Sequence, residues 1–426
     1  MTELSRRVLM VAYHFPPLAG SSGIQRTLRF VQHLPAFGWQ PLVLSANPRA
    51  YERTSDDLSA DVPPGTVVRR AFALDTARHL CVSGRYIGAM ARPDRWVSWR
   101  FDAVRQGMRL IHEFCPQVIW STYPIATAHL IGAELHRRSG LPWVADFRDP
   151  MAQEGYPSDP LTWQSYKRIE ANALQHAGLS VFTTPSAAAE YRKRYPGSAG
   201  RVQVLENGYD EETFASSSSL ALGGALTPGA TTLLHSGIVY PSERDPTQLI
   251  VALSQLQASG AISPSTLRVR FRAPVAEDLI RRLAADHGVS GLVEVLPAIP
   301  YKAALGEMLR ADGLLVMQAT NCNAQIPAKV YEYLRAGRPI ICLADPAGDT
   351  AGALRATGID AIAPLDNVEQ IAALLSRFLR RDGVAPISLP RSESVSQASR
   401  RGRAQVLAGW LNHMSGWQGG PDREAS

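Results

Sequence analysis

Two charged residues, Lys329 and Glu332, have types and a spacing that could bind a nucleotide. A polar loop, 320–325, separates them from an apolar run typical of a buried strand, and Pro327 and Gly337 stand where a helix would begin and end. The positive end of a helix together with a lysine suits a diphosphate, and a carboxylate one turn further along suits the paired hydroxyls of a ribose. The alternative is that Lys329 and Glu332 only pair with each other on the surface.

The loop 13–26, "YHFPPLAGSSGIQR", is a second candidate, because its small residues would let a ligand approach closely. Gly20 and Gly23 are three positions apart, which does not fit the G-x-G-x-x-G pattern of dinucleotide-binding loops, and no acidic residue follows the next expected strand. A redox enzyme is therefore not expected. We interpret the loop as an anion-tolerant turn at a helix N-terminus, with Arg26 in the first turn; the alternative is a plain strand-to-helix turn.

A third candidate is the polar cluster Asp146, Arg148 and Asp149 in "PWVADFRDPM". It ends an expected parallel strand, and ligands bind at the carboxyl ends of such strands. Asp146 and Asp149 are therefore candidates for catalytic chemistry. The alternative, which the sequence leaves open, is an Asp–Arg ion pair that only fixes the loop.

The elements that must position these residues are short apolar runs that alternate with amphipathic helical segments. This alternation predicts the α/β class, with parallel sheets and right-handed crossovers. The expected strands are 7–13, 40–46, 67–73, 117–122, 142–147, 179–184, 202–207, 231–237, 267–273, 293–299, 313–319, 339–344 and 361–365.

A stretch rich in Ser, Gly and Ala interrupts the alternation near residues 215–230 and is typical of a linker. Two doubly wound domains facing each other across a cleft are therefore expected, with the ligand sites in the cleft. The expected parts are an N-terminal domain at 1–210, a linker at 211–230, a C-terminal domain at 231–390, a helix at 391–414 that returns to the first domain, and a disordered tail at 415–426.

The composition limits the class of protein. The 426 residues are 45% hydrophobic, but no apolar run is long enough to cross a bilayer, and the N-terminal "RRVLMVAYHF" lacks a signal-peptide cleavage site. The four cysteines show no metal-ligand spacing and are expected as reduced thiols, so no metal site is predicted. These features predict a cytoplasmic protein.

The basic excess lies entirely in the first half of the chain. Residues 1–210 hold 24 Lys and Arg against 18 Asp and Glu, whereas residues 211–426 hold 20 of each. Six arginines fall between Arg85 and Arg109, together with two tryptophans. This segment is either an ordinary solvated face or a surface for an anionic acceptor or an anionic inner-membrane lipid, which would make the protein peripheral on that membrane. Nucleic acid is not expected, because no recognised binding motif accompanies the segment.

The segment "QIPAKVYEYLRAGRPII" resembles the donor-binding helix of GT-B glycosyltransferases of the family 4-like branch (group 1). The opening loop, "PWVADFRDPM", "VQVLENGYDEETF" and "LLHSGIVYPSERDPTQLI" resemble further segments of that family in the same order, so the likeness spans about residues 6–380. It implies two Rossmann-like domains. It also implies retaining transfer of a sugar from a nucleotide donor, such as a UDP- or GDP-sugar, to a hydroxyl of a saccharide or lipid-linked acceptor, without a metal ion or other cofactor.

The resemblance also implies roles for individual residues. Glu332 would hold the ribose, and the donor's diphosphate would lie among Gly237, Arg244 and Lys329. The loop residues Asn323, Gln325 and Ile326 would approach the sugar or the base. Gly20 and Gly23 would form the N-domain lip over the donor phosphates and the acceptor.

Three positions depart from the family pattern. Ala324 stands where many relatives carry a second Glu, Ile238 follows Gly237 where an Arg is usual, and Ser121 and Thr122 stand where a His is common. His129 lies further along and is expected to be structural. The leading interpretation is a glycosyltransferase of surface polysaccharide or glycolipid assembly; the alternatives are a GT-B sugar-nucleotide epimerase and a non-catalytic sugar-nucleotide-binding partner.

Overall fold

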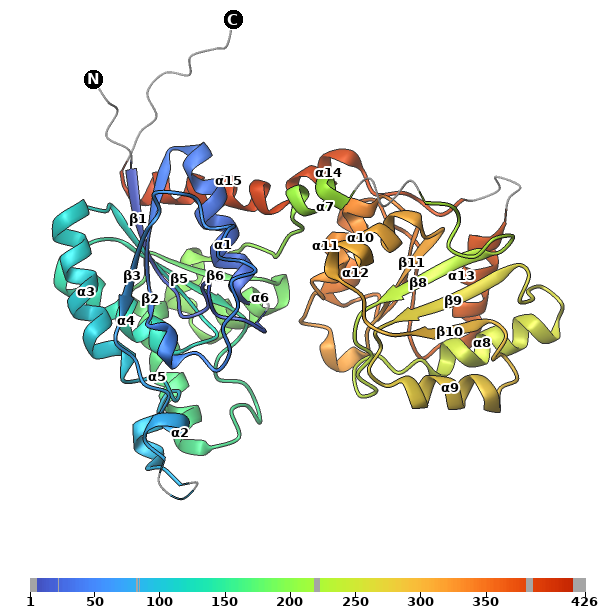
Figure 1. The fold of residues 1–426 in the computed structure, drawn as a ribbon, viewed down its shortest axis with the longest axis horizontal. Helices are drawn as coiled ribbons and strands as arrows, with labels where there is room; N and C mark the ends of the chain where they lie inside the picture. The colour runs from blue at the N-terminus through green and yellow to red at the C-terminus, as the bar shows by residue number, and fades with distance from the viewer. Residues whose placement is uncertain are drawn as a thin grey trace, which may run out of the picture. The chain divides into compact units, whose positions relative to one another are not determined.

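A computed structural model describes residues 6–21, 23–81, 83, 85–217, 223–380 and 386–416. The chain forms two compact units (Figure 1). Unit 1 comprises Met1–Glu206 and Arg400–Ser426, and unit 2 comprises Asn207–Ser399. Unit 1 is therefore built from two separate stretches of the chain.

Unit 1 holds a seven-stranded parallel sheet in the order β3-β2-β1-β4-β5-β6-β7. Its strands are β1 Arg6–Val11, β2 Trp39–Ala46, β3 Val67–Ala71, β4 Val118–Thr122, β5 Trp143–Arg148, β6 Leu179–Phe182 and β7 Val202–Val204. Its helices are α1 Gly23–His33, α2 Thr76–His79, α3 Trp99–Phe114, α4 Thr127–Ser139, α5 Pro160–His176, α6 Pro185–Arg194 and α15 Arg400–Met414, with short 3-10 turns η1 Leu34–Phe37, η2 Pro48–Ala50, η3 Gly88–Ala91 and η4 Pro196–Arg201.

Alternate residues of β1 enter two hydrophobic clusters on opposite faces of this sheet, as the pleat of a strand requires. Leu9 and Val11 pack in the cluster that includes α3, α4, α5 and α6, whereas Val8 and Met10 pack in the cluster that includes α1 and α15. Burial on both faces explains why the central strands read as continuous apolar runs.

Unit 2 holds a six-stranded parallel sheet in the order β10-β9-β8-β11-β12-β13. Its strands are β8 Thr231–Ser236, β9 Leu267–Arg272, β10 Val293–Leu296, β11 Gly313–Met317, β12 Ile340–Leu343 and β13 Ile362–Ala363. Its helices are α7 Glu211–Ser217, α8 Thr247–Ala258, α9 Glu277–Asp286, α10 Tyr301–Arg310, α11 Lys329–Ala336, α12 Asp349–Ala356, α13 Val368–Leu379 and α14 Ser392–Gln397, with a 3-10 turn η6 Thr320–Cys322. The expected α/β fold with two Rossmann-like parallel sheets is confirmed.

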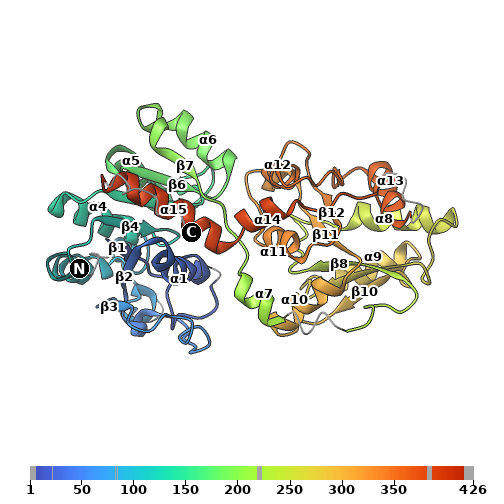
Figure 2. The same ribbon diagram turned by 90° about the horizontal axis from the view of Figure 1, so that it is seen from above.

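The segments between the units differ from the expected linker and helix. Residues 211–217 form α7, whose Phe214 is buried in unit 2, because an aromatic residue there can join the core cluster of α10 and α11. The segment 391–414 is two helices, of which α14 belongs to unit 2 and α15 packs against α1 in unit 1 (Figure 2). The tail expected at 415–426 lies outside the described residues from 417 onward.

Within the part of the chain that is described, no helix has both the length and the apolar character that a bilayer crossing requires.

Candidate functional site

Both sheets reverse their strand order beside their first strand, between β1 and β4 in unit 1 and between β8 and β11 in unit 2. Open α/β sheets bind ligands outside the carboxyl ends of the strands at this switch point. The candidate residues from the sequence fall at these places. Gly237 and Arg244 follow β8, the loop to Glu332 follows β11, and Gly20 and Gly23 follow β1.

In unit 2, the side chains of Lys329, Glu332 and Tyr301 contact one another. The Lys329 Nζ lies 2.8 Å from Oε2 of Glu332, and the Tyr301 hydroxyl donates a hydrogen bond of 2.7 Å to Oε1. The Lys329 ammonium also lies 5.5 Å from the centre of the Tyr301 ring. The ion pair offered as the alternative from the sequence is therefore present in the structure. Tyr301 was missed, since it precedes Glu332 by 31 positions and no local pattern marks it.

Gly237 places bare backbone beside this cluster. Its φ is +140°, a conformation that side-chain-bearing residues rarely adopt, and a Cβ here would lie 3.9 Å from Cε of Lys329. The hydroxyl of Tyr333, on α11, accepts a hydrogen bond of 2.8 Å from the backbone N–H of Ser236. This bond fixes the end of β8 against the helix that carries Lys329 and Glu332.

Arg244 adds a second positive charge at the end of β8. Its guanidinium donates to the carbonyl of Ile238 at 3.1 Å and lies 5.6 Å from the centre of the Tyr240 ring. Burial first, and then the charges of Arg244 and Lys329, lower the pKa of His235 to about 4, although its hydrogen bond to the carbonyl of Leu315 opposes this shift. The positive fields of both side chains thus converge on the last residues of β8.

The loop after β11 is rigid, and this changes the expected roles of its residues. The Asn323 amide donates to Asp345 at 2.5 Å, so this side chain supports the loop rather than being available to a sugar or base. Ile326 is only 9% exposed and packs in the core, which leaves its backbone as the part that could meet a ligand. Gln325 is exposed, and its carbonyl accepts hydrogen bonds from the Gln318 amide and from the Thr350 hydroxyl.

Two hydrogen bonds join the loop after β11 to the loop after β8. The N–H of Ala319 donates to the carbonyl of Glu243 at 2.7 Å, and the Asn321 amide donates to the carbonyl of Ser242 at 3.0 Å. The two loops that carry Arg244 and Lys329 therefore hold each other in place, so the site is preorganised.

In unit 1, Gly20 and Gly23 are required for different reasons. Gly20 has φ +78°, a left-handed conformation, with open space around it. Gly23 begins α1, where a Cβ would collide with Nδ1 of His14 and lie 2.8 Å from Nη1 of Arg148. Burial, and next the charge of Arg148, lower the pKa of His14 to about 4, so this ring is neutral at pH 7. The N-terminus of α1 thus meets a cation and a neutral imidazole.

Asp146 is buried and fully engaged, which contradicts the expectation that it meets a substrate. Arg26 donates to both of its carboxylate oxygens, at 2.9 and 2.7 Å, and the Thr122 hydroxyl donates to Oδ2 at 2.8 Å. The same guanidinium donates to the carbonyl of Leu205 at 3.0 Å. Asp146 is 1% exposed and Arg26 is 4% exposed, so this pair holds the chain in place where it leaves unit 1.

Asp149 is exposed and keeps the geometry expected of a residue that could act on a ligand. The Thr183 hydroxyl lies 3.5 Å from its Oδ1, and within the described residues no ion pair joins it to Arg148. The Asp–Arg pair offered as the alternative is therefore formed by Asp146 and Arg26 instead. Arg148 itself has φ +62°, a strained conformation for a residue with a side chain, and such strain is common at functional sites.

His129, which was expected to be structural, lies on α4 and contacts the end of β4 through Ser121. Its Nδ1 lies 2.8 Å from the Ser121 hydroxyl, which also accepts a hydrogen bond of 2.8 Å from the Trp143 indole. The ring is fully buried, and burial lowers its pKa to about 4.

The six arginines between Arg85 and Arg109 fall into two groups, those that form ion pairs with other described residues and those that do not. Arg92, Arg95 and Arg105 form ion pairs with Asp159, with Glu52 and Asp75, and with Asp102, respectively. Arg85, Arg100 and Arg109 form none with any residue that the structure describes. Trp99 is buried against Tyr13, so it belongs to the core rather than to the basic surface.

Comparison with known sequences finds a family match in the first half of the chain. Residues 22–208 match the family described as "Glycosyl transferase 4-like domain". A D-inositol 3-phosphate glycosyltransferase of Streptosporangium roseum is 25% identical over 261 residues, and the alignment covers 58% of each chain, which is less than two thirds of that relative.

Solved structures with both units show the fold. Anabaena HepE in complex with UDP and glucose aligns with a TM-score of 0.56 at 13% identity, covering 96% of this chain and 97% of that one. A UDP-N-acetylglucosamine 2-epimerase aligns with a TM-score of 0.54 at 13% identity, covering 99% of both chains. At this identity the likeness carries the GT-B fold alone. The chain is thus similar to the glycosyl transferase 4-like family over residues 22–208, less than half of its length, and both of its units share the GT-B fold.

Proposed function

We propose that this protein transfers a sugar, with retention, from a nucleoside diphosphate donor bound on unit 2 to a hydroxyl of an acceptor bound on unit 1. The observation that carries the proposal is the cluster at the end of β8, where Lys329 and Arg244 flank the backbone of Gly237 beside the Glu332 carboxylate. A diphosphate needs cations and a close backbone approach, and a ribose needs a hydrogen-bond acceptor for its hydroxyls.

In this proposal the ion pair between Lys329 and Glu332 is a resting state that the donor replaces. The ribose hydroxyls donate to Glu332, which Tyr301 continues to orient through its hydrogen bond to Oε1. Lys329 then turns to the phosphates, beside Gly237 and Arg244. As the nucleoside diphosphate leaves, negative charge grows on its phosphate, and these two cations stabilise that charge.

The acceptor hydroxyl must approach the anomeric carbon and lose a proton. Asp149 is the proposed proton acceptor on unit 1, because its carboxylate is exposed at the end of β5; a phosphate oxygen of the donor is the alternative. Arg148 and His14, at the N-terminus of α1, would hold an oxygen-rich group of the acceptor near this carboxylate.

We propose a UDP- or GDP-sugar as donor and a saccharide or lipid-linked acceptor of surface polysaccharide or glycolipid assembly, at an anionic membrane surface. HepE, which shares the fold, was crystallised with UDP and glucose, and the relative from Streptosporangium roseum is named for a phosphorylated polyol acceptor. The first supports a sugar nucleotide as donor, and the second supports a hydroxyl-bearing acceptor.

The test of the donor site is calorimetry with UDP and GDP on the wild type, on Glu332→Ala and on Glu369→Ala, a control on the exposed surface of unit 2. A charge-assisted hydrogen bond contributes about 1.5–3 kcal/mol, so Glu332→Ala should weaken binding about 10- to 150-fold while the control leaves it unchanged. The 2′,3′-dideoxy nucleotide should bind all three proteins equally. Unchanged binding of the ribonucleotide by Glu332→Ala would remove this carboxylate from the donor site.

The test of the reaction is incubation with a panel of nucleotide sugars. Transfer to an acceptor or slow hydrolysis of one donor supports the proposal. Isomerisation of the free donor would replace it with an epimerase, and binding without turnover would replace it with a non-catalytic partner.

A further inference from the structure

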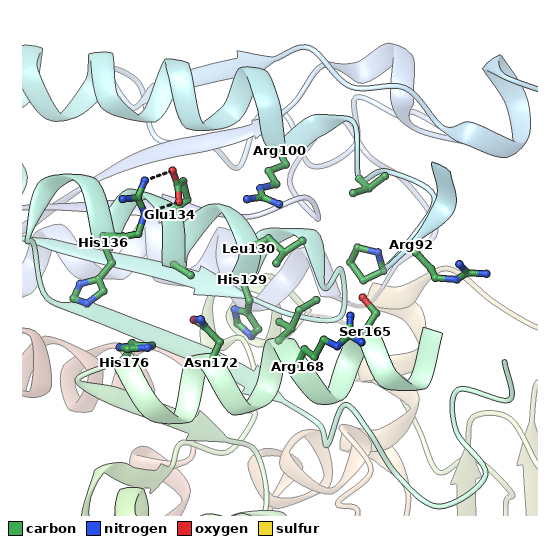
Figure 3. A pocket seen from close by; sticks show the side chains of 15 residues that line it. Arg92, Arg100, His129, Leu130, Glu134, His136, Ser165, Arg168, Asn172 and His176 are labelled. Carbon is green, nitrogen blue, oxygen red and sulfur yellow. Dashed lines mark hydrogen bonds and ion pairs between the residues drawn. The ribbon is translucent and has the colours of Figure 1, made fainter. Parts of the chain in front are cut away.

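A cavity of about 590 Å³ lies in unit 1 between α4 and α5, beside the start of α3 (Figure 3). This cavity is separate from the candidate site at Gly23 and Asp149, because α4, α5 and the start of α3 form its walls. Leu161, Ser165, Arg168 and Asn172 follow one face of α5 at helical spacing, and three of them, Ser165 to Asn172, line the cavity.

The lining is basic. The cavity is lined by one acidic residue, Glu134, and by four arginines, Arg92, Arg100, Arg137 and Arg168. Glu134 is already neutralised, because Arg137 donates to both of its oxygens at 2.9 and 2.7 Å. Its bonds to Arg137 and Arg138 lower its pKa to about 2. The guanidinium groups of Arg100 and Arg168 have no ion pair or hydrogen bond with any described residue.

His129 lies at the floor of the cavity, between α4 and α5 (Figure 3). The Ser121 hydroxyl accepts from the Trp143 indole, and among the described residues only Nδ1 of His129 is placed to accept its own proton, so we assign Ser121 as the donor to that nitrogen. The neutral ring then carries its proton on Nε2, which is buried and has no hydrogen-bond partner among the described residues. A buried donor without an acceptor is costly, and an anionic oxygen would satisfy it.

Exposed large apolar side chains lie close in sequence to the basic lining residues. Met90 is 43% exposed two positions before Arg92, Phe101 is 77% exposed directly after Arg100, and Leu161 is 51% exposed one turn before Ser165. Ile87, on the same segment as Met90, is 68% exposed. A soluble anion would use the arginines but has no use for these side chains.

We propose that this cavity binds the phosphate-bearing headgroup of an anionic lipid, with Ile87, Met90, Phe101 and Leu161 entering the interface of the bilayer. Arg100 and Arg168 hold the phosphate from opposite walls, and apolar side chains with flanking arginines are the composition of interfacial membrane anchors. The inference deepens the membrane partner of the proposed function and gives it a defined site. It does not depend on sugar transfer, because it concerns a different part of unit 1.

The experiment measures binding of the full chain to vesicles of phosphatidylcholine with and without phosphatidylglycerol. Arg100→Gln with Arg168→Gln should weaken binding to the anionic vesicles about 30-fold, since each basic residue near anionic lipid contributes roughly fivefold. The matched control is Arg105→Gln with Arg109→Gln, which removes two arginines of the same segment outside the cavity and should cost less than about threefold. Equal losses of vesicle binding in both variants would contradict a specific site in the cavity. They would mean that binding depends only on the overall positive charge of the surface.

Two further arms separate the sources of phosphate. Ile87→Ser with Met90→Ser should weaken vesicle binding and leave the binding of glycerol phosphate unchanged. Binding of glycerol phosphate without any binding of vesicles would overturn a lipid ligand and assign the cavity to a soluble phosphate. Nucleotide affinity and the melting temperature serve as folding controls, and both should be the same in all variants. A loss of vesicle binding with nucleotide affinity intact therefore separates this inference from the donor site.

Discussion

Two aspartates at the end of one strand, three positions apart, have opposite surroundings and therefore opposite expected effects. Asp146→Asn leaves the buried Arg26 without its counter-charge, which should lower the free energy of unfolding by about 3–5 kcal/mol. Asp149→Asn changes an exposed side chain and should alter stability by less than about 0.5 kcal/mol. If Asp149 takes the proton of the acceptor hydroxyl, the turnover rate of the Asp149→Asn protein should be about 10²- to 10⁴-fold lower than that of the wild type, with unchanged donor affinity.

Urea unfolding and steady-state kinetics on both variants check this contrast. A stable Asp149→Asn protein with wild-type turnover would assign the proton to the donor phosphate instead.

Buried histidines make the stability depend on pH. Burial lowers the pKa of His129 and of His235 to about 4, below the value of about 6.5 in an unfolded chain. The unfolded chain therefore binds these protons first, so stability is complete above pH 6.5, falls as the pH drops, and levels off near pH 4. At pH 5 each histidine should lower the free energy of unfolding by about 2 kcal/mol.

Urea unfolding at pH 7 and at pH 5 measures this loss. His129→Gln should show a smaller loss than the wild type, and the exposed His112→Gln should show the same loss. A pH dependence that is equal in all three proteins would contradict the assignment to His129.

At the scale of elements, α15 is part of the core of unit 1. Leu411 is fully buried in the cluster with α1, and Asn412 accepts a hydrogen bond of 2.8 Å from the Trp39 indole. Leu411→Ala should therefore lower the free energy of unfolding of unit 1 by about 2–5 kcal/mol. Val406→Ala, on the same helix but 41% exposed, should change it by less than about 0.5 kcal/mol. Equal, small effects in thermal unfolding would mean that α15 does not stabilise unit 1.

The elements could be predicted from the sequence more fully than their contacts. Each expected strand has a counterpart in the described residues, because strands buried on both faces, such as β4, leave unbroken apolar runs, and half-buried strands, such as β9, leave alternating ones. The start of α11 differs by a few residues. The helix begins at Lys329 rather than near Ile326, because Pro327 and Ala328 lie in the preceding turn, where the Pro327 carbonyl accepts from the N–H of Val330.

Side-chain partners in the site could not be predicted. Asp146 was expected either to act on a substrate or to pair with its neighbour Arg148, but its partner is Arg26, 120 positions away. Such a pair depends on how α1 packs beside the carboxyl end of β5, and no local spacing in the sequence reveals that packing. The same holds for Asn323, whose amide is held by Asp345 after the next strand.

At the scale of the whole molecule, the two units should respond differently to a nucleotide. A ligand at 100 times its dissociation constant stabilises the part that binds it by about 2.7 kcal/mol. With UDP or GDP, hydrogen exchange should slow in β8 and β11 of unit 2 and remain unchanged in β1 and β4 of unit 1. The Glu332→Ala protein at the same nucleotide concentration is the control and should show little protection. Protection confined to unit 1 would place the donor site there.

The division of unit 1 between the two ends of the sequence has a consequence for synthesis on the ribosome. The apolar face of α1, with Leu28 and Val31, is covered by Leu407 and Leu411, which emerge only after all of unit 2 has been made. At about 5–20 residues per second, residues 207–399 take about 10–40 s to translate. During that interval the apolar face of α1 in the nascent first unit remains exposed. Unit 2 is a single continuous stretch of the chain and can fold on its own. Among the described helices, α15 is thus made last, although it completes the first unit to appear.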